Sequence, residues 1–92
     1  MVASGSPLTF TESDRKQMLW HSRRGMLELD LLLLPFAQNY LSGLGSEDLR
    51  LYRLLLDQED QDLFGWFIRR DVPPTIELQK IVTLVLEQHQ KV

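Results

Sequence analysis

Two arginines, a glycine and two carboxylates stand close together in one segment of the sequence, residues 22–30. They are Arg23, Arg24, Gly25, Glu28 and Asp30. Charged side chains of this kind bind a partner protein through charge-assisted hydrogen bonds, and a glycine among them leaves bare backbone for the partner to approach. The segment is therefore a candidate protein-binding site.

The same segment also has a purely structural interpretation. In it, Gly25 caps the start of a helix, and Glu28 at the third helical position reaches back to the capping N–H. Arg24 is then the solvated partner of Glu28. Because surface ion pairs are common and weak, the segment taken alone favours this structural interpretation.

Residues suited to catalysis or metal binding are sparse in the rest of the chain. His21 and His89 are the only histidines, and neither stands at a metal-ligand spacing from a second His or a Cys. The absence of cysteine excludes disulfides, thiolate zinc sites and cysteine nucleophiles. The acidic run 57–62 lacks the glycine and the distal Glu of a calcium loop. We therefore expect neither a catalytic site nor a metal site.

Composition narrows the classes of protein that remain. The 92 residues carry 10 basic and 13 acidic side chains, a net charge of −3, which argues against a general nucleic-acid or anionic-membrane binder. The longest apolar run, residues 31–37, is far shorter than the roughly 20 residues of a membrane-spanning helix. No secretory or mitochondrial targeting pattern is visible at the N-terminus, so we expect a bacterial cytoplasmic protein without membrane insertion.

Five helices must position the charged segment. Apolar residues recur at intervals of three and four, and no segment alternates as a strand does, which predicts helices at about 12–22, 25–41, 46–56, 60–70 and 75–88. Residues 1–10 predict a disordered lead-in, and residues 11–92 predict a helical domain. The expected fold is all-α, a small five-helix bundle in a single domain.

Local signals predict where these helices begin and bend. Thr11 and Asp14 have the spacing of a capping box at the start of the first helix. Ser46 and Asp60 are the expected N-caps of the third and fourth helices. Pro35 falls inside the second apolar run, where the missing backbone donor predicts a kink or a break.

The aromatic and leucine-rich segments indicate the core. Trp66 is expected in the core with Phe64 and Phe67, because three aromatic residues in four positions of a short helix cannot all be exposed. The run 31–34 predicts a fully buried helix face. Trp20 is either a packing residue or the rim of an interface, and both interpretations remain open.

A longer pattern surrounds the charged segment. The run Arg24-Gly25-x-x-Glu28, within Arg23-Arg24-Gly25-Met26-x-Glu28-Leu29-Asp30, resembles the signature of the FAD assembly factor (SdhE) family, whose mitochondrial relatives are called succinate dehydrogenase assembly factor 2. The resemblance covers about residues 15–87 and continues through Pro35-Phe36, Leu54-Leu55, Asp62-Leu63-Phe64-x-Trp66, Pro73 and Glu77-Leu78.

The resemblance implies a small all-α protein that binds the flavoprotein subunit of succinate dehydrogenase, and in bacteria often that of fumarate reductase too. Such a protein promotes covalent attachment of FAD to a histidine of its client and holds no cofactor tightly itself. The chemistry belongs to the client and its flavin. The implied contact residues are Arg24, Gly25 and Glu28, with Arg23 and Asp30 as flanking support.

An alternative from another class is a small helical regulatory or nucleic-acid-binding module. It would use the basic cluster of Arg15, Lys16, Arg23 and Arg24, because local basic clusters bind phosphates even on an acidic protein. The acidic residues interleaved with this cluster would repel a phosphate backbone.

Overall fold

Five α-helices form the fold in the computed structural model, which describes residues 10–90. They are α1 (Glu12–His21), α2 (Leu27–Tyr40), α3 (Ser46–Leu56), α4 (Asp60–Phe67) and α5 (Ile76–Gln90), with a short 3₁₀ turn, η1 (Leu41–Gly43), after α2. No strand occurs within residues 10–90, and the predicted all-α five-helix fold is confirmed. The predicted lead-in lies outside the described residues except for Phe10, which packs against the core.

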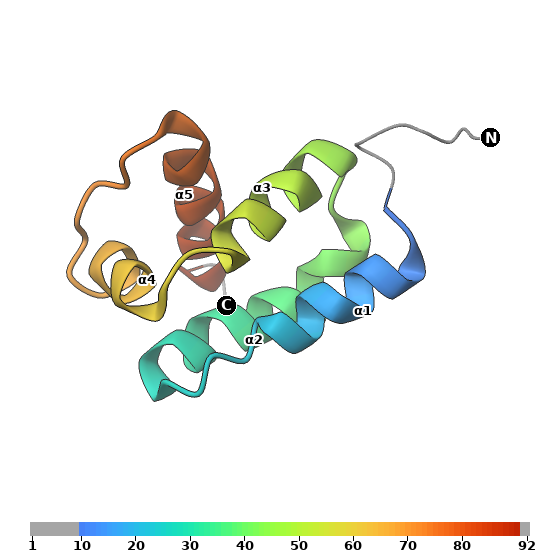
Figure 1. The fold of residues 1–92 in the computed structure, drawn as a ribbon, viewed down its shortest axis with the longest axis horizontal. Helices are drawn as coiled ribbons and strands as arrows, with labels where there is room; N and C mark the ends of the chain where they lie inside the picture. Colours follow the sequence, from blue (N-terminus) through green and yellow to red (C-terminus); the bar gives the residue numbers. More distant parts are fainter. Residues whose placement is uncertain (1–9, 91–92) are drawn as a thin grey trace.

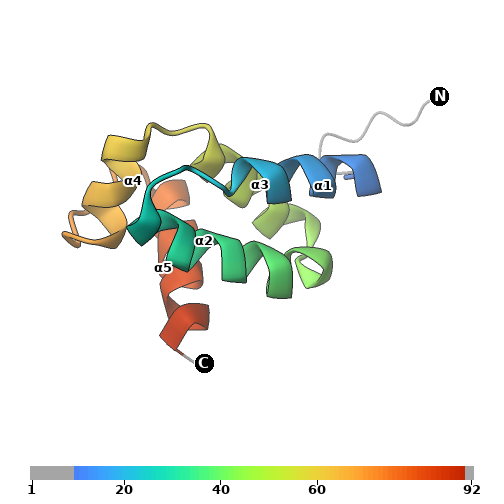
Figure 2. The same ribbon diagram turned by 90° about the horizontal axis from the view of Figure 1, so that it is seen from below.

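The helices pack in pairs that enclose one core. Helices α1 and α2 lie side by side and run in opposite directions, and α3 follows along the same pair (Figure 1). Helix α5 packs against both α2 and α3 and crosses α2 steeply, while α4 lies at the end of the molecule where α2 begins (Figure 2). The loop from α1 to α2 therefore faces the loop from α3 to α4.

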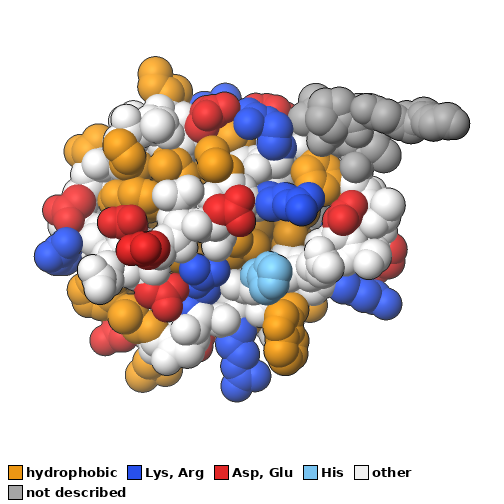
Figure 3. Space-filling model, in the orientation of Figure 1, with side chains coloured by type: hydrophobic (Ala, Val, Ile, Leu, Met, Phe, Trp, Pro, Cys, Tyr) orange, Lys and Arg blue, Asp and Glu red, His pale blue; other side chains and the backbone are white. Residues whose placement is uncertain are grey.

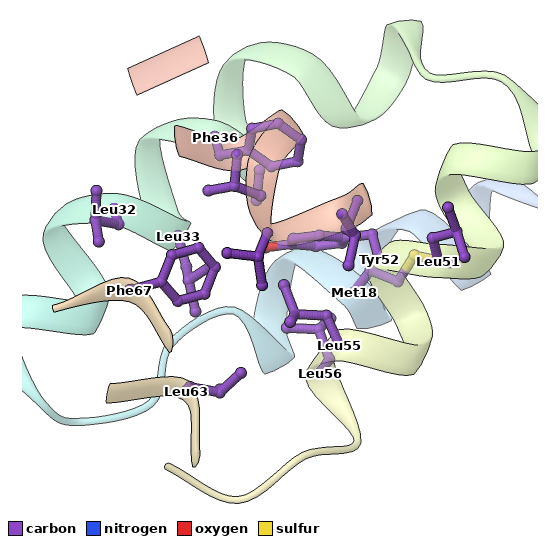
Figure 4. Packing of buried hydrophobic residues seen from close by; sticks show 14 of the residues in the cluster. Met18, Leu32, Leu33, Phe36, Leu51, Tyr52, Leu55, Leu56, Leu63 and Phe67 are labelled. Atoms are coloured by element: carbon purple, nitrogen blue, oxygen red, sulfur yellow. The ribbon is translucent and has the colours of Figure 1, made fainter. Parts of the chain in front are cut away.

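The core draws on residues of every helix. Tyr52 of α3 is fully buried, and its ring packs 5.2 Å from that of Phe36 of α2, close to Met18 of α1 (Figure 4). Trp66 and Phe67 are buried as predicted, whereas Phe64, expected in the core with them, is only half-buried. The aromatic residues of α4 thus support the fold more than they form a surface.

One expectation for α2 is wrong, and a second is narrowed. The side chain of Leu31 is 59% exposed, whereas Leu32 and Leu33 are buried, so the run 31–34 does not form a fully buried face. Successive helical residues turn by about 100°, and four in a row cannot face one side. Of the kink or break expected at Pro35, the break does not occur: α2 continues through the proline, which is exposed and removes only one backbone donor while its neighbours keep α2 packed in the core.

Helix boundaries follow the local signals in part. The capping box at α1 is confirmed: the Asp14 N–H donates to Thr11 Oγ1 at 3.1 Å, and the Thr11 N–H donates to Asp14 Oδ2 at 2.9 Å. Two hydrogen bonds with Thr11 hold the pKa of the Asp14 carboxyl below its usual value: the bond with the Thr11 backbone has the larger effect, and the bond with its side chain the smaller one. Gly45, one residue before the predicted Ser46, is the N-cap of α3.

Helix α4 ends at Phe67, three residues before the predicted end. Its termination is fixed by Arg70, whose φ of 65° places the backbone in the left-handed region. The N–H of Asp71 then donates to the carbonyl of Gly65 at 2.9 Å. This turn leads the chain into the proline-containing connection to α5.

Among residues 10–90, no helix combines the length and the apolar character that spanning a bilayer requires.

Candidate protein-binding site

The charged segment forms the connection between α1 and α2, and its first residue is anchored in the core. Ser22 is fully buried; its Oγ donates to the carbonyl of Met18 at 2.8 Å and shares a 2.6 Å hydrogen bond with the Tyr52 hydroxyl. Burial raises the pKa of Tyr52 to about 12, so this hydroxyl stays protonated at neutral pH. The end of α1 is thereby fixed to α3.

The side chain of Arg24 points into the molecule, where it is 15% exposed. Its guanidinium donates to three backbone carbonyls, those of His21 at 3.1 Å, Leu56 at 2.9 Å and Gln58 at 2.8 Å. Its Nε donates to Asp60 Oδ1 at 2.8 Å. Leu56 is the last residue of α3, where helix carbonyls lack internal partners and the helix dipole favours a cation. Arg24 therefore joins the α1–α2 loop to the α3–α4 loop.

These contacts correct two expectations. The ion-pair partner of Arg24 is Asp60 of α4, and the predicted pairing of Arg24 with Glu28 is wrong. Asp60 is also not the N-cap of α4: that position belongs to Glu59, and its side chain makes no capping hydrogen bond. The Asp60 carboxylate is instead turned toward Arg24.

Asp30 stabilises the same loop from the other side. Its Oδ1 accepts the backbone N–H of Arg24 at 2.8 Å, which ties the loop to the first turn of α2. Both the backbone and the side chain of Arg24 are therefore held by contacts within the chain.

Gly25 is exposed, and its backbone has φ +82°. A Cβ at this position would meet no atom within 4 Å. The glycine is thus required by the backbone conformation and not by crowding within the chain. The space above it is open to another molecule.

Glu28 lies on the outer surface of α2. The N-cap of α2 is Met26 and no side chain caps this helix, so the predicted capping roles of Gly25 and Glu28 are wrong. The carboxylate of Glu28 makes no hydrogen bond or ion pair with another residue between 10 and 90. Leu27 and Leu31 beside it are 69% and 59% exposed. The Glu28 carboxylate thus has no partner among residues 10–90 and stands beside two exposed leucines, in a groove that Arg70 and His89 also line.

Arg23 is exposed and borders a shallow cleft on the other side of the loop. Trp20 contributes to this cleft and is 73% exposed, so it is not a packing residue of the core. We call the outward-facing residues Arg23, Gly25 and Glu28 the outer strip. The structure brings these three predicted residues to the surface and turns Arg24 away from it.

Sequence reasoning missed Asp60 as the partner of Arg24, and it left Trp20 undecided. The two residues of the ion pair are 36 positions apart, and nothing in the local pattern relates them. The exposure of Leu27 and Leu31 was equally hidden by the uniformly apolar run around them.

The nucleic-acid alternative loses one of its four basic residues, because Arg24 is held inward by Asp60. Acidic and basic side chains are interspersed on the face seen in Figure 3 and do not form a single basic patch there. Within residues 10–90, no group of three or more His, Asp or Glu side chains is arranged to hold a metal ion.

Residues 10–90 form a small all-α domain of five helices that exposes an acid, an arginine and a glycine around one braced loop. The family described as "Flavinator of succinate dehydrogenase" matches residues 16–89 of the sequence. The match covers most of the chain, and the chain belongs to this family.

Individual relatives carry a consistent name. The chain is 49% identical to the FAD assembly factor SdhE of Pseudomonas aeruginosa over 79 residues, which cover 86% of this chain and 94% of the relative. It is 47% identical to the protein of the same name from Pseudomonas putida over 79 residues, with the same coverage. The Shewanella oneidensis relative of that name is 47% identical over 66 residues, 72% of this chain and 80% of the relative.

Proposed function

We propose that this chain is an FAD assembly factor that binds the flavoprotein subunit of succinate dehydrogenase and promotes covalent attachment of FAD to it. The observation that carries the proposal is the family match over residues 16–89, which includes the whole charged segment. The relatives named FAD assembly factor SdhE support it, because the alignment with the Pseudomonas aeruginosa protein covers 94% of that protein. The role is that of a chaperone for a cofactor-attachment step.

The outer strip is the proposed contact with the client. Glu28 offers a carboxylate without a described partner, which suits a cationic group of the flavoprotein, and Gly25 lets the client backbone approach the loop. Arg23 adds a cation at the other end of the strip. Arg24 and Asp30 act indirectly, because their hydrogen bonds fix the loop that carries the outer strip. We assign them positioning roles.

The chemistry of flavin attachment lies in the client. The bond forms between FAD and a histidine of the flavoprotein, and the flavin supplies the reactive atom. The chain itself presents no nucleophile or acid–base pair at the outer strip. It acts by binding, without a tightly held cofactor or catalysis of its own, and the bacterial relatives support action in a bacterial cytoplasm. We extend the client range to the flavoprotein of fumarate reductase.

A deletion strain tests the proposal. Without this protein, the succinate dehydrogenase flavoprotein subunit should carry little covalent FAD, which fluoresces under ultraviolet light in a denaturing gel. The wild-type protein supplied in trans should restore the fluorescence, and Glu28→Ala should not. Undiminished fluorescence in the deletion strain, grown without added flavin, would contradict the proposed function.

A further inference from the structure

The outer strip is too small to account for a specific complex. Stable protein–protein interfaces use about 20–30 residues and roughly 800 Å² on each partner, and the strip contains three residues. The contact must therefore extend beyond it. Two surfaces adjoin the strip, one along α1 past Arg23 and one along α2 past Glu28.

The surface along α1 contains the shallow cleft introduced above, of about 250 Å³, which we call the Trp20 cleft. Its lining residues come from α1, the loop after it and α2: Lys16, Leu19, Trp20, Arg23, Leu34 and Gln38. Lys16 and Trp20 stand four residues apart on one face of α1, and Arg23 of the loop after α1 lines the same cleft. The cleft is continuous with the outer strip, because Arg23 belongs to both.

Trp20 is the feature of this cleft that the fold does not explain. Its side chain is 73% exposed, and that of Leu19 is 38% exposed. A tryptophan left in water forgoes the burial of a large apolar area, and residues of this type dominate the energetics of protein interfaces. The position is well suited to an anchor that is buried when a partner binds.

The charges around Trp20 indicate the chemistry of that partner. Lys16 and Arg23 line the cleft, none of its lining residues is acidic, and neither cation forms an ion pair with another residue between 10 and 90. Arg15 lines the adjoining hollow together with Lys16 and one acid, Glu12, and its buried Nε has no hydrogen-bond partner among residues 10–90. Cations without partners around an apolar centre favour an occupant that is acidic and carries an apolar side chain.

We propose that the Trp20 cleft is a second docking surface and that it receives an acidic segment of the client flavoprotein with an apolar side chain seated against Trp20. This inference rests on the proposed function, since it takes the same flavoprotein as the partner. The surface along α2, a groove of about 540 Å³ lined by Leu31, Ile68 and Arg70 among others, mixes acidic and basic residues and gives no such charge signature.

The test measures the dissociation constant of the purified flavoprotein subunit with Trp20→Ala, Lys16→Gln and Lys16→Glu. Trp20→Ala should weaken binding at least tenfold, since a central aromatic anchor is lost, while the fold remains because the ring is already in water. Lys16→Glu should weaken binding more than Lys16→Gln, and both differences should shrink at high salt, as expected for an acidic occupant.

Two control variants lie in the first two turns of α5, and neither residue lines the Trp20 cleft. Lys80→Glu reverses the charge of another exposed lysine, and Ile76→Ala truncates an apolar side chain that is 72% exposed. Both should bind the flavoprotein within about twofold of the wild type, because surface substitutions outside a contact have small effects.

Each other result has a distinct meaning. If the wild type binds the flavoprotein and Trp20→Ala binds it as tightly as the two controls do, the second docking surface is overturned and the proposed function stays intact. A larger loss in Leu31→Ala than in Trp20→Ala would place the extension along α2 and would also overturn it. RNA binding that Lys16→Glu abolishes, with flavoprotein binding unchanged, would assign the cations to nucleic acid. Failure of the wild-type chain to bind the flavoprotein at all would overturn the proposed function and this inference together.

Discussion

The loop between α1 and α2 and the first turn of α2 are neighbours in the sequence, yet the folded chain uses their charges differently. In the loop, Arg24 donates to three carbonyls and to Asp60, and its side chain is almost enclosed. In the turn, Glu28 is exposed and meets no described partner. Charge in a motif therefore does not by itself identify a contact residue.

The difference follows from what each side chain finds within reach. The loop passes the end of α3, where helix carbonyls lack internal donors, and the planar guanidinium has five donors to satisfy them. Glu28 stands at the start of a helix, where the dipole favours an acid. Its carboxylate makes no hydrogen bond or ion pair with another residue between 10 and 90, although Arg70 and His89 line the same groove. The donors of Arg24 are occupied by contacts that hold the fold together, whereas the carboxylate of Glu28 remains available to a partner.

The largest expected effect on stability belongs to Arg24→Ala. The change removes four hydrogen bonds and leaves the Asp60 carboxylate and the end of α3 without their donor, which should lower the free energy of unfolding by about 3 kcal/mol. Urea denaturation followed by circular dichroism measures this loss.

Arg24→Lys is the matched control for this change. A lysine keeps the charge but lacks the planar fork that reaches several carbonyls at once, so it should recover only part of the lost stability. An Arg24→Ala protein as stable as the wild type would show that the internal bonds contribute nothing, and Arg24 would become a contact residue.

The next effect concerns Tyr52 and alkaline pH. The pKa of Tyr52 is about 12 in the folded chain, above its ordinary value of 10.0, because burial disfavours the phenolate. The stabilisation that the buried, neutral Tyr52 hydroxyl contributes is therefore complete below pH 10 and is lost as the pH rises toward 12. Relative to Tyr52→Phe, the wild type should lose about 2 kcal/mol of unfolding free energy across this interval. Parallel pH dependences for the two proteins would contradict the anchoring of Ser22 by a buried neutral phenol.

Substitutions at Gly25 should have a smaller effect on stability and a larger one on binding. Gly25→Ala forces a side chain into the left-handed region at φ +82°, which costs about 1–2 kcal/mol. Gly25→Asn should cost less, because asparagine tolerates this region better. Gly25→Arg should fold about as well as Gly25→Ala, since a Cβ there meets nothing, but its bulk should prevent capture of the flavoprotein. A Gly25→Arg protein that captures the client normally would show that the space above Gly25 is not part of the contact.

Glu28→Ala should have the smallest effect on stability, within about 0.5 kcal/mol, because its carboxylate has no described partner to lose. Binding should weaken by about 2–5 kcal/mol if the carboxylate meets a cation of the client. Thermal denaturation and titration with the flavoprotein measure the two quantities separately. Glu28→Gln, which keeps the shape and removes the charge, should lose nearly as much binding; retention of full affinity would exclude a charged contact.

Local patterns in the sequence were sufficient for the helices, the capping box at Thr11 and the burial of Trp66, because each depends on residues close in the chain. The same local patterns did not predict contacts between residues that are far apart in the sequence. The Arg24–Asp60 pair joins two loops 36 positions apart, and the outward position of Leu31 depends on which sides of α2 its neighbours cover. The charged segment was found from the sequence; the division of its residues between fold and surface required the tertiary structure.

The division of labour between Arg24 and Glu28 is the central claim, and one paired measurement tests it most directly. Urea denaturation and flavoprotein capture are carried out on the same preparations of Arg24→Ala and Glu28→Ala, with and without a stabilising osmolyte such as sucrose, which favours the folded state. Arg24→Ala should lose stability and capture together, and sucrose should restore capture; Glu28→Ala should stay folded and capture nothing in either condition. A stable Arg24→Ala protein whose lost capture sucrose does not restore, or a Glu28→Ala protein that fails only through unfolding, would contradict the account.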